Sequence, residues 1–410
     1  MGPRPPAPTE AGADPAATMV YRQALGANVI DVDGNRFVDL AAGFGSLLLG
    51  HRPKRVQAAM DAQSGRLLQS LGDVHPSDIK IQLLERLATF IEGGGQGIIG
   101  QSGADALSAA LKTAVLYTGR PGVVAFDGAY HGLSYGPLAL CGLRKSYRSP
   151  FAEQLNPAVH FVEYPHGEEA LDRVLGSLRR ELSRGDVGAV VYEPILGRAG
   201  VVVPPAAFAE RLAEACREFG SLLIADEVWT GLGRSGHWLF SRAQGVQADI
   251  LCLGKGLGGG LPISACIGSR QVMAAWSRSE EVVHTSTFAG APLACAAALE
   301  TLTALEEQAL VERSQKLGRE LSAALSEAFP ASWPSGWEVR GEGLMLGIDP
   351  GPHQPVAIEL ARELLRRGYI VSLGGGRRES LVLTPALDVC EALLDGFVSA
   401  FADALRAVPA

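Results

Sequence analysis

The chain has 410 residues, of which 47% are hydrophobic and 20% are charged. This composition is typical of a globular protein of two or three domains and excludes extensive disorder beyond the first residues. A net charge of −8 would repel polyanions, so we expect no nucleic-acid partner. No run of about 18 apolar residues occurs, so we also expect no membrane span. The six cysteines form no CxxC pair, which predicts reduced thiols and a cytoplasmic protein.

The predicted elements start after a flexible, Pro- and Ala-rich tail at residues 1–18. Asp33 and Gly34, between the short runs VID and FVD, predict a hairpin with a two-residue turn. Apolar strand runs then alternate with amphipathic helices, which include residues 105–118 and 208–219. The strand runs lie at 97–101, 122–126, 158–162, 187–193, 221–225 and 249–253. Near-continuous apolar strands separated by helices predict a mostly parallel sheet covered on both faces.

The C-terminal region predicts a smaller α+β unit. From about Ala297 a long helical pattern leads into mixed strands and helices that end at Ala410. We divide the chain into an N-terminal segment at 19–57, a large domain at 58–300 and a C-terminal segment at 301–410. Because the two outer segments are each short of apolar sequence for a core, we expect them to pack together as one small domain.

Residues able to do chemistry follow several of the predicted strands. Ligands of open parallel sheets bind beyond the carboxyl ends of the strands. Asp226 follows the run at 221–225, Lys255 follows the run at 249–253, and Tyr130 and His131 follow the run at 122–126. The run at 97–101 leads into Ser102, Gly103 and Ala104, which open a helix. A carboxylate, a lysine, an aromatic ring and a helix N-terminus are therefore expected at one edge of the sheet.

This combination suits pyridoxal phosphate. A lysine in a glycine-walled pocket can form a Schiff base with an aldehyde, and a buried carboxylate can keep a pyridine nitrogen protonated. An aromatic side chain can stack on the ring, and amides at a helix N-terminus can hold the phosphate. We expect no metal site, because His160, Glu163 and His166 lie in the strand-like run HFVEYP and fit a surface segment better.

The chain resembles the class III aminotransferases, which are pyridoxal-phosphate enzymes of fold type I related to ornithine and 4-aminobutyrate aminotransferases. The resemblance runs from about Tyr21 to Ala402 and rests on motifs in a fixed order, including GANVIDVDGNRFVDLAAG, SGADA, FDGAYHG, YEPILGRAGVVVPP, LLIADEVWTGLGRSG, CLGKGLGGGLPISA and TSTFAGAPLACAAALE. It implies an α/β fold with a mostly parallel seven-stranded sheet in a large domain and a smaller α+β domain. It also implies a homodimer with a shared active site, which moves an amino group between an amine or amino acid and a keto acid or aldehyde.

The same resemblance implies roles for particular residues. Lys255 would hold the cofactor as a Schiff base and then move protons, and Asp226 would face the pyridinium nitrogen. Tyr130 and Val228 would flank the two faces of the ring. Thr287 would reach the phosphate bound in the neighbouring subunit. The other implied cofactor-binding positions are Ser102, Gly103, Ala104, His131 and Glu193.

Three departures from the family pattern concern the substrate. Arg198 stands where relatives commonly have a glutamate after the EPxxG run, and Val382 stands where they have its C-terminal arginine partner. Trp229 replaces a glutamine. We expect Arg198 and Trp229 near the substrate, with Arg198 either binding a carboxylate or lying exposed at the entrance. An aminomutase, racemase or decarboxylase would use the same lysine and aspartate, and a non-catalytic pyridoxal-phosphate-binding homologue is the alternative of another class.

Overall fold

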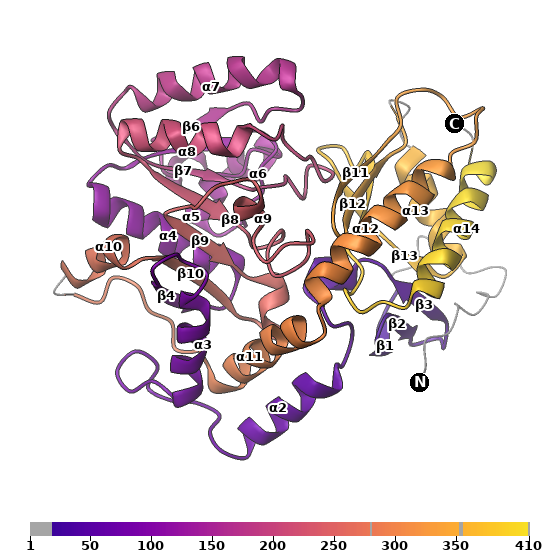
Figure 1. The fold of residues 1–410 in the computed structure, drawn as a ribbon, viewed down its shortest axis with the longest axis horizontal. Coiled ribbons are helices and arrows are strands. Elements are labelled where there is room, and N and C mark those ends of the chain that lie inside the picture. Colours follow the sequence, from indigo (N-terminus) through magenta and orange to yellow (C-terminus); the bar gives the residue numbers. More distant parts are fainter. Residues whose placement is uncertain (1–18, 279–280, 352–355, 409–410) are drawn as a thin grey trace.

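The computed structural model describes residues 19–278, 281–351 and 356–408, so the tail expected at 1–18 lies outside the described residues. Its larger part is built on a seven-stranded sheet (Figure 1). Neighbouring strands from β9 to β6 run parallel, which confirms the expected mostly parallel sheet. In spatial order the strands are β4 (Gly95–Gly100), β10 (Ser264–Ser269), β9 (Ile250–Leu253), β8 (Leu222–Asp226), β7 (Val187–Tyr192), β5 (Gly122–Phe126) and β6 (Val159–Val162).

Helices cover both faces of this sheet, and Figure 1 shows α7 (Glu168–Leu182) and α8 (Phe208–Phe219) together on one side. In β8, Leu223 and Ala225 belong to the hydrophobic cluster that includes these two helices. Leu222 and Ile224 belong to the cluster formed with α4 (Gly103–Thr118) on the opposite face. Because successive side chains of a strand point to opposite faces, this two-sided burial explains the near-continuous apolar runs.

Strand β10 is the one strand of this sheet that hydrophobic periodicity did not single out. Its sequence SACIGS consists mostly of small residues, and it runs antiparallel to both β4 and β9. Because β10 lies between β9 and β4, it brings the end of β4 and the start of α4 to the same side of the molecule as the end of β9. The antiparallel strand thereby helps to position the site described below.

The predicted hairpin forms, but its connection is longer than the expected two residues. β2 (Asn28–Asp31) and β3 (Arg36–Asp39) pair antiparallel, and residues 32–35 connect them. The Asp31 carboxylate accepts hydrogen bonds from the amides of Asp33 at 3.0 Å and Asn35 at 2.8 Å. This side-chain bonding stabilises a wider loop than Asp33 and Gly34 alone predict.

The N-terminal and C-terminal segments meet in the smaller part of the molecule, where β13 (Tyr369–Ile370) pairs parallel with β3. This contact supports the expected packing of the two segments, although the domain boundaries themselves stay predictions. One small sheet has the order β1 (Tyr21–Leu25), β2, β3, β13, and the other has the order β11 (Glu338–Glu342), β12 (Met345–Asp349), β15 (Ser380–Leu383), β14 (Ser372–Gly374). Helices α13 (Val356–Arg366) and α14 (Glu391–Ala407) lie beside them (Figure 1).

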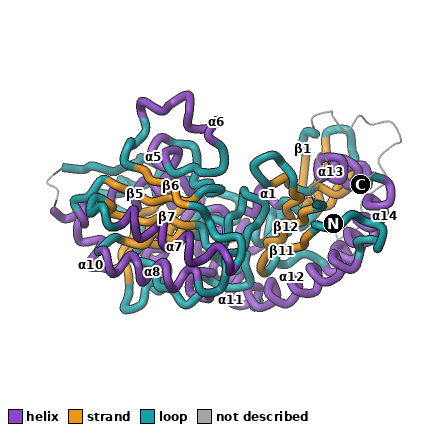
Figure 2. Tube along the Cα trace, turned by 90° about the horizontal axis from the view of Figure 1, so that it is seen from above, coloured by secondary structure: helices purple, strands orange, loops and turns teal. Residues whose placement is uncertain are grey.

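The long helical pattern from Ala297 is divided into two helices, α11 (Pro292–Glu307) and α12 (Leu310–Glu327). Ala309 between them has a φ of +49°, which interrupts the helical path. Figure 2 shows α11 and α12 following one another from the large sheet toward the small part. The remaining α-helices are α1 (Ala42–Gly45), α2 (Lys54–Ser64), α3 (Asp78–Ala88), α5 (Tyr135–Ala139), α6 (Lys145–Arg148), α9 (Phe240–Ala243) and α10 (Arg270–Met273).

Candidate active site

A cavity of about 250 Å³ lies beyond the carboxyl ends of β5, β8 and β9. It brings together nearly all of the residues that the sequence placed at this edge of the sheet. Of the predicted site residues, Arg198 and Thr287 do not line it, whereas Gly132 lines it without having been predicted. The lining residues are Ser102, Gly103, Ala104, Tyr130, His131, Gly132, Glu193, Asp226, Val228, Trp229 and Lys255.

Lys255 begins a short 3₁₀ turn, η2 (Lys255–Gly258), that follows β9 directly. Its φ of +27° is strained for a residue with a side chain, and such strain is concentrated at functional sites. Burial of the amine lowers its pKa from 10.5 to about 8, although the nearby carboxylates of Asp226 and Glu193 act in the opposite direction. An appreciable fraction of the amine is therefore unprotonated near neutral pH, as a nucleophile requires.

Asp226 ends β8 and forms a buried pair with His131. Its Oδ2 lies 2.7 Å from His131 Nδ1, and its Oδ1 accepts a hydrogen bond from the amide of Val228 at 3.1 Å. Burial alone would lower the pKa of His131, but the hydrogen bond and the charge of Asp226 outweigh burial and raise it. His131 therefore orients the carboxylate from one side and leaves the rest of it available to a cation in the cavity.

Glu193 follows β7 and connects two loops of the site. One carboxylate oxygen accepts from the amide of Tyr130 at 2.7 Å, and the other accepts from the amide of Gly197 at 3.1 Å. Burial raises the pKa of Glu193 to about 7. Because both oxygens are engaged within the protein, the structure supports a positioning role for Glu193, holding the Tyr130 loop against the loop that leads to Arg198.

The N-terminus of α4 points free amides at the cavity. Ser102 and Asp105 form a capping box, in which Ser102 Oγ accepts from the Asp105 amide at 3.2 Å and Asp105 Oδ2 accepts from the Ser102 amide at 3.1 Å. The amides of Gly103 and Ala104 have no acceptor among the residues that the structure describes. A Cβ on Gly103 would lie 2.8 Å from Val228 Cγ1, so only glycine lets the helix approach Val228 so closely. This end of α4 is a ready anion site.

The chemical groups of these residues match the groups of pyridoxal phosphate, the expected cofactor. The free amides of Gly103 and Ala104 suit a phosphate, and the amine of Lys255 with its lowered pKa suits an aldehyde. The buried carboxylate of Asp226 suits a protonated ring nitrogen. Tyr130 and Val228 both line the cavity, as the predicted stacking on the two ring faces requires.

Trp229 forms an apolar wall of the cavity. The Lys255 Nζ lies 3.8 Å from the centre of its ring, and the indole Nε1 is buried without a hydrogen-bond partner among the described residues. Met345 and Val382 pack in the same hydrophobic cluster as Trp229. Val382 on β15 is 1% exposed. The two departures from the family pattern at Trp229 and Val382 thus pack in one hydrophobic cluster, and this wall of the cavity carries no charge.

Arg198 lies beside the cavity, in contact with two aromatic rings. The carbon of its guanidinium is 5.6 Å from the centre of the Tyr130 ring and 6.0 Å from that of Phe44. Sequence reasoning missed Phe44, which is held in a left-handed stretch of α1 with Gly43 and Gly45 on either side. The two glycines flanking an aromatic residue are the signal that could have marked this position.

Thr287 does not reach the cavity of its own subunit. It lies in an exposed segment, where its carbonyl oxygen accepts a hydrogen bond from Gln69 Nε2 at 3.1 Å. This location leaves its predicted role toward a neighbouring subunit as a prediction.

Two further properties concern the part of the chain that the structure describes. None of its helices has both the length and the apolar character that crossing a membrane requires. Nor does it contain a group of three or more His, Cys, Asp or Glu residues suited to a metal ion. His160 instead lies 3.3 Å from Glu181, with which it forms an ion pair when protonated.

Comparison with known proteins gives concordant matches over most of the chain. The model of the family described as "Aminotransferase class-III" matches residues 9–405. An acetylornithine aminotransferase of Methanosarcina mazei is 34% identical over 93% of this chain and 90% of its own length. A 4-aminobutyrate aminotransferase of Mycobacterium leprae is 31% identical over 91% and 87%. The structure of an amine transaminase from an uncultivated Pseudomonas species, in its PLP-bound form, superposes with a TM-score of 0.89 at 29% identity, covering 98% of this chain and 97% of the other.

Proposed function

The chain belongs to the class III aminotransferases, and from that premise we propose that it transfers an amino group between an amine or amino acid and a keto acid or aldehyde at the cavity around Lys255. The observation that carries the proposal is a lysine with a lowered pKa that shares one cavity with a buried carboxylate and the N-terminus of α4. Amino transfer needs these three groups together, because it needs an amine nucleophile, an electron sink and an anchored cofactor.

Pyridoxal phosphate is the cofactor of this reaction. When bound, it supplies an aldehyde that bonds covalently to amines and a protonated ring that draws electrons away from the neighbouring C–H bond. Gly103, Ala104 and Ser102 would hold its phosphate, and Asp226 would hold its ring nitrogen. Tyr130 and Val228 would exclude water from the two ring faces.

Lys255 would carry the protons of the reaction on its Nζ. A group that both accepts and donates a proton works best when its pKa lies near the working pH, and a pKa of about 8 meets that condition. Burial of the amine and the indole ring 3.8 Å away keep competing water from it. Glu193 and His131 would act by positioning Tyr130 and Asp226 rather than by exchanging protons with the substrate.

No specific observation favours an aminomutase, a racemase or a decarboxylase over amino transfer, and the related proteins reported above are named as aminotransferases or transaminases. These reactions would differ in stoichiometry, because only amino transfer consumes one keto acid or aldehyde acceptor per amine. A non-catalytic homologue has no support in a chain whose cavity brings together both Lys255 and Asp226.

The proposal includes a homodimer in which Thr287 completes the site of the partner. Apolar side chains that are more than half exposed gather on two segments, at Leu68, Leu71, Val74, Val282 and Phe288. The segments lie together, because Gln69 donates to the Thr287 carbonyl and Thr285 donates to Asp73 at 2.8 Å. An apolar surface of this kind, next to a residue with an expected role across an interface, fits a second copy of the chain. We also propose a cytoplasmic location, supported by six cysteines that are all free thiols.

The test compares the wild type with Lys255→Ala, and Lys316→Ala on the exposed face of α12 serves as the control. We expect wild-type turnover to depend on a keto acid or aldehyde acceptor, and borohydride reduction to fix the cofactor to the peptide that contains Lys255. Lys255→Ala should fold, bind the cofactor without covalent attachment and lose turnover, whereas the control should behave as wild type. Turnover without an acceptor would contradict amino transfer, and undiminished covalent attachment in Lys255→Ala would contradict the assignment of the lysine.

A further inference from the structure

Two arginines and three aromatic side chains form a row beside the cavity. The guanidinium carbon of Arg144 is 5.9 Å from the centre of the Tyr147 ring, and the Tyr147 and Tyr130 rings are 6.2 Å apart. Arg198 follows, at 5.6 Å from the Tyr130 ring and 6.0 Å from the Phe44 ring. We call these residues the arginine–aromatic row. Because Tyr130 lines the cavity, the row borders the place where a substrate would lie.

In the described part of the chain, the two arginines of the row have no anionic partner. Neither Arg144 nor Arg198 forms an ion pair with a residue that the structure describes, whereas Arg340 pairs with both Glu338 and Asp349. The Nε of Arg144 and that of Arg198 are each buried without a hydrogen-bond acceptor in the same part of the chain. A guanidinium is always charged in a protein, and leaving its buried N–H groups without acceptors is costly. Both arginines of the row therefore have N–H groups that can donate to an anion.

The charge of Arg198 acts at the reacting centre. After burial, which is the largest effect, Arg198 contributes to lowering the pKa of Lys255, so the two groups belong to one electrostatic site. The Arg198 carbonyl oxygen also accepts a hydrogen bond at 2.8 Å from Gly375, whose loop carries Arg377 and Arg378. Both of these arginines are exposed, and neither has an ion pair within the described residues. Glu379 in the same loop offsets part of this charge, because its carboxylate accepts from the Arg377 amide. Three arginines against this one carboxylate leave the side near Arg198 positive, and it would attract an anion.

Phe44 is held beside Arg198 by a strained turn. Ala42 and Phe44 both have positive φ values, of +43° and +58°, which residues with side chains seldom adopt. The Asp39 carboxylate fixes the start of the turn by accepting from the amide of Ala42 at 2.8 Å. Phe44 is nevertheless 59% exposed. Strain that is maintained in order to expose an aromatic ring is expected where the ring covers a ligand.

The wall of the cavity that Trp229 forms offers no charge to a substrate. Trp229, Met345 and Val382 belong to one apolar cluster there, so of the positions that depart from the family pattern only Arg198 offers a charge. We propose that Arg198, flanked by Phe44 and Tyr130, binds an oxyanion, either a carboxylate or a phosphate, on the part of the substrate remote from the transferred amino group. The inference rests on the proposed function, because Lys255 defines where that amino group lies.

The chemistry of the row fits this task. A guanidinium presents N–H groups in a planar fork that matches two oxygens of a carboxylate or phosphate. The two flanking rings would exclude water from the pair and so strengthen it. Arg144, at the outer end of the row, adds a second positive charge without contacting the same rings as Arg198. Binding of the oxyanion makes and breaks no covalent bond.

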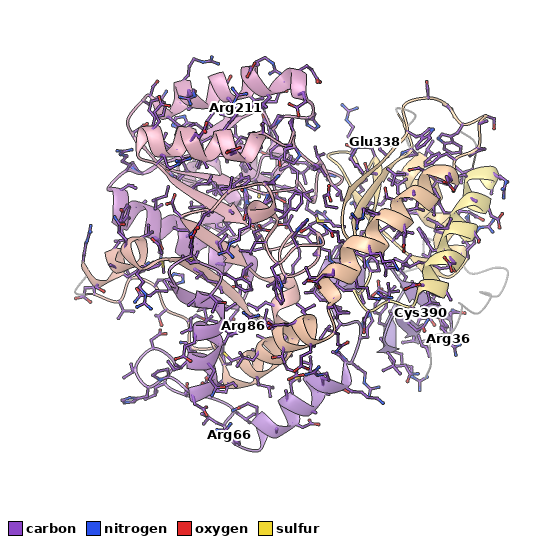
Figure 3. All side chains as sticks on the ribbon, viewed as in Figure 1. Arg36, Arg66, Arg86, Arg211, Glu338 and Cys390 are labelled. Carbon is purple, nitrogen blue, oxygen red and sulfur yellow. The ribbon has the colours of Figure 1, made fainter. Side chains whose placement is uncertain are left out.

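Calorimetry on the cofactor-loaded protein tests the anion site without requiring turnover. The probes are glutarate, propyl phosphate and the neutral 1,5-pentanediol. We expect Arg198→Ala to weaken the binding of at least one oxyanion by about 10- to 100-fold, as for a lost charge-assisted hydrogen bond, and to leave the diol unaffected. Arg198→Lys should recover only part of the loss. Arg211→Ala is the matched control, because Arg211 lies on α8 (Figure 3), where it pairs with Asp172 and is no part of the row.

The second arm uses amines of one length, namely hexylamine, 6-aminohexanoate and 6-aminohexyl phosphate. Arg198→Ala should lower kcat/KM for the anionic amines by a similar factor and leave hexylamine nearly unchanged. A preference for the carboxylate or for the phosphate in both arms identifies the source of the oxyanion. Equal effects of Arg198→Ala on charged and neutral compounds, or oxyanion binding that is unchanged in this variant, would overturn the inference. If no amine reacts with any acceptor, the proposed function fails, and the calorimetric arm still decides on the anion site.

Discussion

Replacing Lys255 with methionine should stabilise the protein in the absence of cofactor. Methionine has nearly the same length as lysine but carries no charge, so the substitution removes a charge that the cavity shields from water. The burial that lowers the pKa of Lys255 from 10.5 to about 8 corresponds to about 3 kcal/mol of unfavourable free energy for the protonated amine. We expect a gain of about 1–3 kcal/mol in the free energy of unfolding near pH 7.

The sign of this effect gives it a distinctive pH dependence. Below the folded pKa of about 8 the amine is protonated in both states, so its cost to the folded state is fully present. As the pH rises from about 8 to the unfolded value of 10.5, the unfolded chain retains a proton that the folded chain has released, and the wild type gains stability. The advantage of Lys255→Met should therefore shrink over this range and vanish above it.

Urea unfolding of the cofactor-free proteins near pH 7 and above about pH 10 measures the difference. Lys316→Met is the control, because the Lys316 side chain is 69% exposed and should give little change at either pH. A variant that is no more stable than wild type near pH 7, or one whose gain persists unchanged at high pH, would refute the argument that the cavity destabilises a charged Lys255. The expected result would show that keeping a reactive amine at position 255 lowers the free energy of unfolding of the cofactor-free protein.

Two further predictions concern the cofactor site and the subunit interface. Asp226→Asn should retain bound cofactor but lose most of its turnover, and near-wild-type turnover would exclude the role assigned to the carboxylate. The substitution also removes the partner that raises the pKa of His131. The variant should therefore lose more stability below about pH 6.5, where His131 is protonated, than well above the raised pKa of His131. Thr287→Ala should weaken cofactor binding by about 1–3 kcal/mol. Mixing Thr287→Ala subunits with Lys255→Ala subunits should restore activity, because a mixed dimer contains one site with both substitutions and one site with neither. No recovery despite demonstrated subunit exchange would show that Thr287 does not act across the interface.

The chemistry at the strand ends could be predicted because it depends on local sequence. A buried parallel strand leaves a strong apolar signal, and the residue that follows it must lie at one edge of the sheet. Asp226 and Lys255 were found in this way, and both line the cavity. Periodicity did not find β10, because a strand of small residues has no apolar signal. The predicted length of the hairpin turn was wrong. The Asp31 carboxylate bonds to the amides of Asp33 and Asn35, and the dipeptide Asp33-Gly34 alone does not reveal these bonds.

The contacts that tune the site could not be predicted, because they join segments far apart in the sequence. Glu193 and Tyr130 are 63 positions apart, and His131 and Asp226 are 95 apart. The motifs identified these residues as members of a site. They did not show that the Glu193 carboxylate bonds to two loops or that His131 bonds to Asp226. Phe44 was missed for a related reason, since an exposed aromatic ring acquires meaning only when Arg198 is seen beside it.

Arg234 joins the large part of the molecule to the C-terminal part of the chain. Its guanidinium is fully buried and has no carboxylate partner among the described residues, and it donates to the carbonyl oxygens of Leu344 at 2.9 Å and Pro385 at 2.5 Å. Both carbonyls come from the C-terminal part of the chain, whereas Arg234 follows the turn after β8 that carries Trp229. Thr384 adds a hydrogen bond to the carbonyl of Ala41 at 3.0 Å, at the start of the turn that presents Phe44. The apolar wall and the strained turn are therefore held by the same C-terminal segment, so a change in how that segment packs would move both sides of the substrate entrance together.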